Sequence, residues 1–241
     1  MEIKIYNSID RLYDDVVAEF ANIINNKDNP VLGLATGSSP IGVYKRLIQM
    51  YNDGQLDFSN TTTFNLDEYC GLGKDDEQSY VYFMHDNLFN HINIKEENIH
   101  IPNGLIDPQQ ACDHYNKMLE QHQIDLQILG VGSNGHIAFN EPGTDFDSTT
   151  HQVELAQKTI NDNARFFEGD TSKVPTKAIT MGLDNIMQAN QIVLIATGKN
   201  KQDAIKGLVL GDLTTSLPAS ILQNHHNVTV YLDEEAAGGL L

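Results

Sequence analysis

The residues best suited to proton-transfer chemistry lie in a glycine-rich stretch, GVGSNGHIAFNEPG, at positions 130–143. Within it His136 and Glu141 stand five residues apart, and Asn134 comes shortly before the histidine. The four glycines and Pro142 are incompatible with a regular helix or a central strand, so a tightly turned loop is predicted. An imidazole beside a carboxylate can move protons near neutral pH. A lone histidine in a turn is usually structural, but this one follows an apolar run and has a carboxylate nearby, which favours catalysis.

A second group of candidate residues is the acidic pair Asp67–Glu68, which follows the apolar run TTTFNL. Because side chains alternate along an extended chain, the two carboxylates should not face the same way. We expect one to enter a crevice while the other accepts structural hydrogen bonds, with Asp67 as the candidate base. Taken alone, a turn-forming aspartate or a solvated pair would be the simpler interpretations. Cys70 lies close by, but no local base partner marks it as a nucleophile.

The run VLGLATGSSP indicates a turn that can hold an anion. Gly37 permits unusual backbone angles, and the hydroxyls of Thr36, Ser38 and Ser39 can donate hydrogen bonds. Pro40 falls at the predicted first position of a helix, whose free N–H groups favour a negative charge. The Gly-Lys-Ser/Thr of a nucleotide-binding loop is absent. An ordinary strand-to-helix turn with a serine cap is an equally good interpretation of this stretch.

Basic side chains are scarce, with 15 Lys and Arg against 33 Asp and Glu and a net charge of −18. Two of them are candidate ligands for an anion. Arg165 lies in NARFFEGD, and Lys201 lies at the predicted start of a helix after the apolar run IVLIA. A cation is unfavourable at a helix N-terminus unless an anion is bound there. Lys199 is the alternative ligand, and either lysine can instead be simply solvated.

The composition excludes several classes of protein. The acidic balance leaves no basic patch of the kind that nucleic acids require. The first ten residues do not have the organisation of a signal peptide, and the longest apolar runs are too short to span a bilayer. Two cysteines make no disulfide framework, and no Cys/His cluster has zinc-ligand spacing. We therefore expect a cytoplasmic protein with no metal, no cofactor, no nucleic-acid partner and no membrane contact.

The elements that must position these residues alternate between short apolar runs and longer amphipathic segments. Strands are predicted at 3–6, 31–35, 62–66, 126–131, 178–180, 192–196 and 228–232. Helices are predicted at 12–24, 39–51, 79–92, 107–122, 182–189 and 201–210.

Several of these strands are apolar throughout, as expected when helices cover both faces of a sheet. The sequence therefore predicts a Rossmann-like α/β fold with a mainly parallel sheet, formed by residues 1–241 as a single domain. Ligands of such sheets bind beyond the carboxyl ends of the strands, where the candidate residues lie. The polar segment 144–176 is expected to be a mobile flap. The residues alone thus predict an enzyme that performs proton chemistry on a small anionic substrate.

These motifs together resemble the glucosamine-6-phosphate deaminase family, in its short, non-allosteric bacterial type. The resemblance extends from about residue 30 to residue 232 and rests on LGLATGSSP, FNLDEYCGL, SYVYFM, LQILGVGSNGHIAFNEPGT, NARFFEGD and VPTKAITMG. It implies the conversion of glucosamine 6-phosphate and water into fructose 6-phosphate and ammonia. The classification it implies is a hydrolase as well as a deaminase and isomerase of amino-sugar metabolism.

The resemblance also implies roles for the candidate residues. His136, supported by Asn134 and Glu141, would open the sugar ring. Asp67 would then carry a proton between carbon 2 and carbon 1 through an enolamine-like intermediate.

The remaining candidates would bind the substrate. The phosphate would be held by Thr36, Gly37, Ser38 and Ser39 together with Arg165 and Lys201. Segment 144–176 would be an active-site lid that brings Arg165 into contact on closure.

The sequence departs from the family pattern at two places. Some members carry Asp where this chain has Asn134, so an orienting role without charge is expected here. The large allosteric members have basic residues after the EPG turn, where this chain reads TTHQVEL and has no Lys or Arg from Asp145 to Gln157. The chain also ends soon after its last predicted strand. We therefore expect a monomer without allosteric activation.

Two alternatives remain at this stage. A 6-phosphogluconolactonase-like hydrolase would share the fold and a similar Gly-His turn, but that family lacks the combination of FNLDEY and NEPG. A non-catalytic sugar-phosphate sensor would carry a DNA-binding module, for which a first strand beginning at residue 3 leaves no room.

Overall fold

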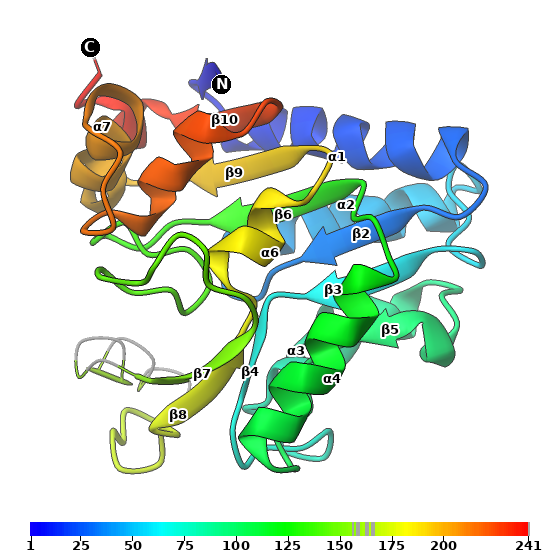
Figure 1. Ribbon diagram of the computed structural model, residues 1–241. Helices are drawn as coiled ribbons and strands as arrows, with labels where there is room; N and C mark the ends of the chain where they lie inside the picture. The colour runs from blue at the N-terminus through cyan, green and yellow to red at the C-terminus, as the bar shows by residue number, and fades with distance from the viewer. Residues whose placement is uncertain (156, 158–159, 162–163, 165–166, 241) are drawn as a thin grey trace.

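Seven strands form the central sheet, and every pairing between them is parallel. The strand order is β1-β10-β9-β6-β2-β3-β5. The strands are β1 (Glu2–Tyr6), β2 (Val31–Leu34), β3 (Thr62–Asn65), β5 (Ile99–His100), β6 (Leu126–Gly130), β9 (Ile192–Ala196) and β10 (Val228–Asp233). The computed structural model, shown in Figure 1, describes residues 1–155, 157, 160–161, 164 and 167–240.

The helices follow the amphipathic segments of the sequence closely. They are α1 (Ile9–Asn26), α2 (Ile41–Asn52), α3 (Tyr80–Asn87), α4 (Pro108–Glu120), α6 (Leu183–Met187), α7 (Gln202–Leu210) and α8 (Glu234–Ala237). Short 3-10 turns are η1 (Phe89–His91), η2 (Glu96–Asn98), η4 (Lys199–Lys201) and η5 (Pro218–Asn224). Local chemistry fixes several helix starts: Ser79 caps α3 by accepting from Tyr82 N, and Asp107 caps α4 by accepting from Gln110 N.

The helices cover both faces of the central sheet. Figure 1 shows α1 and α2 side by side on one face and α4 and α6 on the other. The buried face of α1 includes Leu12, Val16 and Phe20, spaced by four residues as one helical face requires. All five residues of β9 are buried, because this strand lies inside the sheet with helices on either side. The predicted α/β fold with a mainly parallel sheet is confirmed.

A second, antiparallel sheet of three strands adjoins the first and was not predicted. Its order is β4 (Asp67–Tyr69), β8 (Lys177–Thr180) and β7 (His151–Glu154). The predicted strand at 178–180 belongs to this sheet. The chain leaves β3, passes Leu66, whose N–H donates to Leu34 O at 3.2 Å, and enters β4 directly. Strand β7 lies within the polar segment 144–176, whose sequence gave no strand signal.

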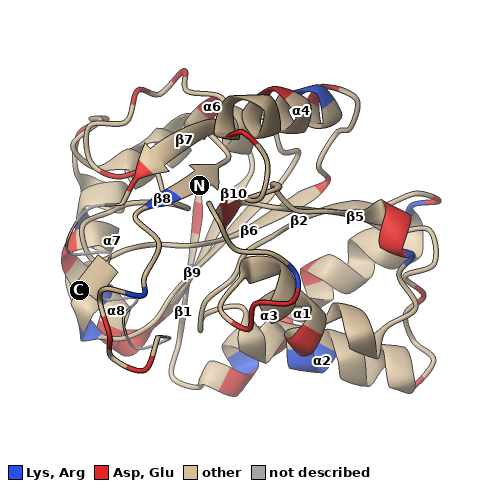
Figure 2. Ribbon diagram, turned by 90° about the horizontal axis from the view of Figure 1, so that it is seen from below, with Lys and Arg blue, Asp and Glu red and all other residues tan. Residues whose placement is uncertain are grey.

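The surface is acidic in many places. Figure 2 shows Asp and Glu spread over helices and loops around the sheet, with few Lys and Arg between them. Among the described residues, no helix is long and apolar enough to cross a membrane.

Candidate functional site

A cavity of about 670 Å³ opens at the carboxyl ends of four neighbouring strands of the central sheet, β9, β6, β2 and β3. The segments that follow these four strands supply most of its wall. It is lined by residues 35–39, 66–67, 69, 77–80, 83, 130–134, 136, 138–139, 161, 167 and 200–201. The cavity therefore lies where the sequence placed the candidate site, and its size suits a small organic ligand.

The loop after β6 is folded by its glycines around His136. Gly132 N donates to His136 O at 2.9 Å, and Gly135 adopts a φ of +84°, which favours glycine. A Cβ on Gly132 would lie 2.3 Å from ring atoms of His136. Glycine at position 132 therefore lets the imidazole pack directly against the backbone of its own loop.

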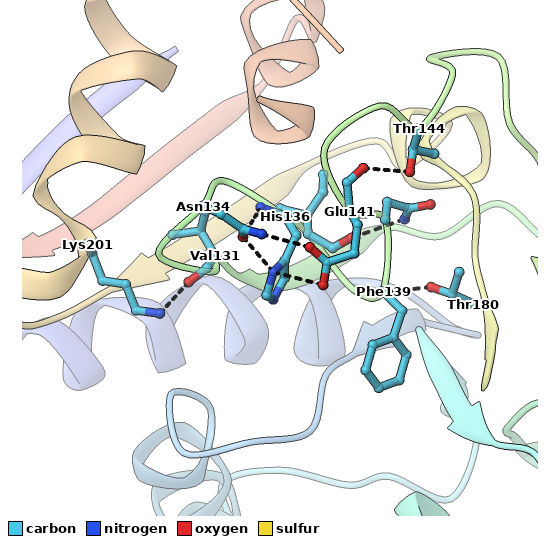
Figure 3. A network of polar contacts seen from close by, with 10 residues as sticks. Val131, Asn134, His136, Phe139, Glu141, Thr144, Thr180 and Lys201 are labelled. Carbon is cyan, nitrogen blue, oxygen red and sulfur yellow. Dashed lines mark hydrogen bonds and ion pairs between the residues drawn. The ribbon is translucent and has the colours of Figure 1, made fainter. Parts of the chain in front are cut away.

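Asn134 connects His136 to Glu141 (Figure 3). Its Nδ2 donates to Glu141 Oε2 at 2.7 Å, and its Oδ1 lies 2.8 Å from His136 Nδ1. A second Glu141 oxygen, Oε1, lies 3.6 Å from the same ring nitrogen. An ionised carboxylate can only accept, so Glu141 turns the amide of Asn134 so that its oxygen faces the histidine.

This orientation of Asn134 selects one tautomer of His136. The amide oxygen must receive a hydrogen, so Nδ1 of the imidazole carries the proton. In the neutral ring Nε2 is then the unprotonated nitrogen that can act as a base. His136 and Asn134 line the cavity, and Glu141 supports them. The structure thus brings these three predicted residues together.

The chain beyond His136 is anchored to the second sheet. Phe139 N donates to Thr180 Oγ1 at 3.2 Å (Figure 3). Asn140 Nδ2 donates to Met181 O at 2.9 Å. Ala138 has a φ of +52°, an uncommon conformation for a residue with a Cβ. These contacts fix the path of the backbone from His136 to Glu141.

Asp67, the first residue of β4, lines the cavity and is 6% exposed. Burial raises the pKa of its carboxyl to about 8, and the neighbouring charge of Glu68 adds to this rise. A carboxylate with a raised pKa is a stronger base than an ordinary aspartate. Pairing of Asp67 with Thr180 on β8 fixes its backbone position.

Glu68 has a different environment from that of Asp67. It is 2% exposed and accepts hydrogen bonds from Tyr69 N at 2.8 Å and from Tyr80 N and Val81 N at 2.9 Å each. Burial raises the pKa of Glu68, and these three N–H groups oppose the rise. The expected division, with one carboxylate in a crevice and the other in structural hydrogen bonds, is confirmed.

The loop after β2 forms the opposite wall, where residues 36–39 all line the cavity. Gly37 has a φ of +90°, so the chain turns there in a conformation that other residues rarely adopt. Helix α2 begins at Ile41. Pro40 was predicted to be its first residue but is its N-cap, the residue just before the helix. No side chain caps this helix start, so no side chain of the protein competes with a ligand for its first N–H groups.

The three candidate cations are placed differently. Lys201 lines the cavity, and its Nζ donates to Val131 O at 2.7 Å (Figure 3). Lys199 is exposed and lies outside the residues that line the cavity. Arg165 is outside the described residues, so its role stays a prediction.

An aromatic wall of the cavity was missed by the sequence analysis. It consists of Tyr69, Tyr80, Phe139 and Phe167. Tyr80 and Phe139 stack with ring centroids 6.0 Å apart, and Tyr69 lies 4.8 Å from Tyr80. The Tyr80 phenol also hydrogen-bonds with the side chain of Thr36. Two of these residues stand in FNLDEYCGL and SYVYFM, which the sequence analysis quoted without assigning them to the site.

The site offers hydroxyls, one amine and two proton-transfer groups. Within the part of the chain that the structure describes, no three His, Cys, Asp or Glu side chains are arranged to hold a metal ion. The groups on the cavity wall suit acid–base chemistry on an anionic molecule.

Comparison with known proteins identifies the family of this chain. The model of the family described as glucosamine-6-phosphate isomerases/6-phosphogluconolactonase matches residues 6–231. The chain belongs to this family. Its similar members include a glucosamine-6-phosphate deaminase of Thermoanaerobacter sp. (strain X514), which is 55% identical over 231 residues that cover 93% of this chain and 91% of the relative. The resemblance inferred from the motifs is thereby confirmed.

Solved structures show the same relationship. The structure of a monomeric glucosamine-6-phosphate deaminase matches with a TM-score of 0.96 at 41% identity, covering 99% of this chain and 100% of that one. A 6-phosphogluconolactonase from Thermotoga maritima matches with a TM-score of 0.78 at 19% identity, covering 97% and 99%. At that identity the second likeness shows a shared fold alone.

The expected classification of the protein as a hydrolase is wrong. Similar curated members of the family are named deaminases, and the likeness to the Thermotoga maritima lactonase, at 19% identity, shows the fold alone.

Proposed function

We propose that this chain converts glucosamine 6-phosphate and water into fructose 6-phosphate and ammonia. The observation that carries the proposal is the pairing, in one cavity, of a buried carboxylate with a raised pKa and a histidine whose tautomer is fixed. Ring opening and proton transfer between adjacent carbons need two such groups. The name of the Thermoanaerobacter relative supports the choice of substrate.

His136 performs the first step of the proposed reaction. Its Nε2 takes the proton of the hydroxyl on carbon 1 and returns a proton to the ring oxygen as the bond between that oxygen and carbon 1 breaks. The imidazolium that exists between these two transfers is stabilised by Glu141, 3.6 Å from Nδ1. Asn134 holds the ring so that Nε2 remains the reacting nitrogen.

Asp67 performs the second step. Its ionised carboxylate removes the proton from carbon 2 of the open-chain aldehyde. The oxygen on carbon 1 takes a proton from the ammonium group on carbon 2, which gives an enolamine with a hydroxyl on carbon 1. The resulting acid delivers a proton to carbon 1, and carbon 2 becomes an iminium carbon. Water adds to carbon 2, ammonia leaves, and the ketone of fructose 6-phosphate remains.

The phosphate of the substrate is assigned to the cradle of Thr36, Gly37, Ser38 and Ser39, with Lys201 and Arg165 as its cations. Support comes from the turn at Gly37, the helix start behind it, and the position of Lys201 on the cavity wall. Opposite charge and backbone N–H groups are the general requirements for binding phosphate.

Segment 144–176 is proposed to act as the lid. Asn161 and Phe167 of this segment line the cavity, so its movement would change access to the site. We further propose that the protein works as a monomer, as the structurally similar deaminase does. A charged sugar phosphate does not cross membranes unaided, and we therefore place the reaction in the cytoplasm.

The test is ammonia release from glucosamine 6-phosphate by the purified chain, measured in a coupled assay. The proposal expects ammonia and fructose 6-phosphate in equal amounts. Acid release from 6-phosphoglucono-lactone, measured in parallel, would instead indicate lactonase activity. Absence of ammonia release from glucosamine 6-phosphate would contradict the proposal.

A further inference from the structure

Glu68 is a buried carboxylate that takes no part in the proposed reaction. Its three hydrogen bonds come from backbone N–H groups at 2.8, 2.9 and 2.9 Å. The donors are Tyr69, on its own strand β4, and Tyr80 and Val81, the first two residues of α3. One side chain thus ties the strand that carries Asp67 to the start of the helix that carries Tyr80.

These donors favour the ionised form of Glu68. Free N–H groups at the start of a helix stabilise a negative charge, and three N–H donors match a carboxylate that only accepts. A protonated carboxyl would direct one of its oxygens as a donor and satisfy these groups less well. Burial still raises the pKa of Glu68, to about 7, so Glu68 carries its negative charge in the pH range in which Asp67, with a pKa raised to about 8, ionises.

Other ionisable groups also face Asp67. The charge of Asp67 contributes to the raised pKa of the Tyr80 and Tyr115 phenols. Burial is the main cause of the raised pKa of the Asp67 carboxyl itself. The remaining ionisable groups on the cavity wall are those of Tyr69, Glu77, His136 and Lys201. Glu68 differs from these groups because it is the immediate chain neighbour of Asp67 and is buried with it. It also contributes to the raised pKa of the Asp67 carboxyl.

We propose that Glu68 is a positioning residue with two effects: its charge makes Asp67 a stronger base, and its hydrogen bonds hold Tyr80 in the cavity wall. The inference rests on the proposed function, in which Asp67 removes a proton from carbon 2. The two effects reach the site by different routes, through charge and through the backbone of α3. Variants can therefore separate them.

The charge effect has a defined sign. Asp67 reacts as a carboxylate, so kcat/KM falls as the pH falls through its pKa. Removing the neighbouring negative charge lowers that pKa, because ionisation of Asp67 then meets less repulsion. The acidic limb of the pH profile therefore moves to lower pH, and the plateau drops because the base is weaker.

The experiment compares wild type, Glu68→Gln and Glu68→Asp in the ammonia assay from pH 5.5 to 9.5. For Glu68→Gln we expect the acidic limb to move down by about one pH unit and the plateau of kcat/KM to fall about threefold to tenfold. Glu68→Asp keeps the charge but shortens the reach to Tyr80 and Val81. Its acidic limb should stay in place while kcat/KM falls at every pH. The amine and phosphate of the substrate titrate identically for all three proteins.

An active Glu68→Gln enzyme whose acidic limb stays in place would overturn the charge effect. A Glu68→Asp enzyme whose acidic limb moves down by about one pH unit would also overturn the charge effect, because this variant keeps the charge. This variant alone tests the charge effect if Glu68→Gln does not fold. Unchanged kcat/KM in Glu68→Asp would overturn the positioning of Tyr80. Failure of the wild type to release ammonia would contradict the proposed function instead, so the two outcomes are distinct.

Discussion

Asn134 shows how one amide can link an imidazole to a carboxylate. It donates to Glu141 and accepts from His136 at the same time, with distances of 2.7 and 2.8 Å. A carboxylate could accept from the histidine but could not donate to Glu141 without a proton. The chain therefore keeps one negative charge, that of Glu141, behind the imidazole. The amide of Asn134 is oriented by Glu141 and in turn orients the ring of His136.

Replacing Asn134 by Leu tests this relay. The substitution removes both hydrogen bonds at similar volume, so His136 loses the partner that fixes its tautomer. We expect kcat for ammonia release to fall about 10- to 100-fold. The thermal unfolding midpoint, measured alongside, controls for loss of fold. A kcat within twofold of wild type would show that His136 needs no such support.

The elements show how a parallel sheet collects distant residues. Four neighbouring strand ends bring together segments that start near residues 35, 66, 131 and 198. Two of these segments turn sharply through a glycine at positive φ before their helix or loop begins, at Gly37 and Gly198. The formation of the cavity therefore depends on the order of the strands in the sheet more than on any one sequence motif.

The position of Lys201 at the end of β9 leads to a prediction with an internal control. Because its amine lies on the cavity wall, Lys201→Ala should raise KM for glucosamine 6-phosphate about tenfold or more, through loss of a charged phosphate contact. Lys199→Ala removes the same charge two residues away, outside the cavity wall, and should leave KM within about twofold. Equal effects of both substitutions would mean that general charge, and not the contact, matters.

The larger elements were predictable because their patterns are strong. The stripe Leu12, Val16 and Phe20 predicts α1, and the fully apolar run of β9 predicts an interior strand. Strands β4 and β7 have three and four residues, DEY and HQVE, and show no such pattern. Their pairing with β8 is a tertiary event, so local sequence did not reveal it.

The candidate site was predictable where a residue type is rare in its setting. His136 in a glycine-rich turn and Asp67 at a strand end have chemistry that draws attention. Tyr80 does not, because an aromatic residue at the start of a helix is usually packing. Its place on the cavity wall follows from tertiary contacts, among them the hydrogen bond of its backbone N–H to Glu68 and its stacking on Phe139.

The whole molecule combines a net charge of −18 with a cavity proposed to bind an anion. Long-range repulsion of the substrate must be offset locally, by a small number of cations and backbone N–H groups. Lys201 is the cation that the described cavity wall provides. This contrast explains why a single lysine is expected to affect KM strongly.

The oligomeric state gives the prediction at this scale. We expect light scattering after size-exclusion chromatography to report the mass of one chain. We also expect the rate to depend hyperbolically on glucosamine 6-phosphate and to be unchanged by N-acetylglucosamine 6-phosphate, because the stretch after the EPG turn carries no basic residue. A sigmoidal curve that this compound shifts would contradict the expectation.

The central claim, that Asp67 is the base acting on carbon 2, is tested most directly by Asp67→Asn. The substitution keeps the shape of the side chain and removes its ability to take a proton. Ammonia release should fall at least about 1,000-fold. Binding of fructose 6-phosphate, measured by calorimetry, should stay within about threefold of wild type, since the phosphate cradle lies on other strands. Turnover above about a tenth of the wild-type rate would remove Asp67 from this role.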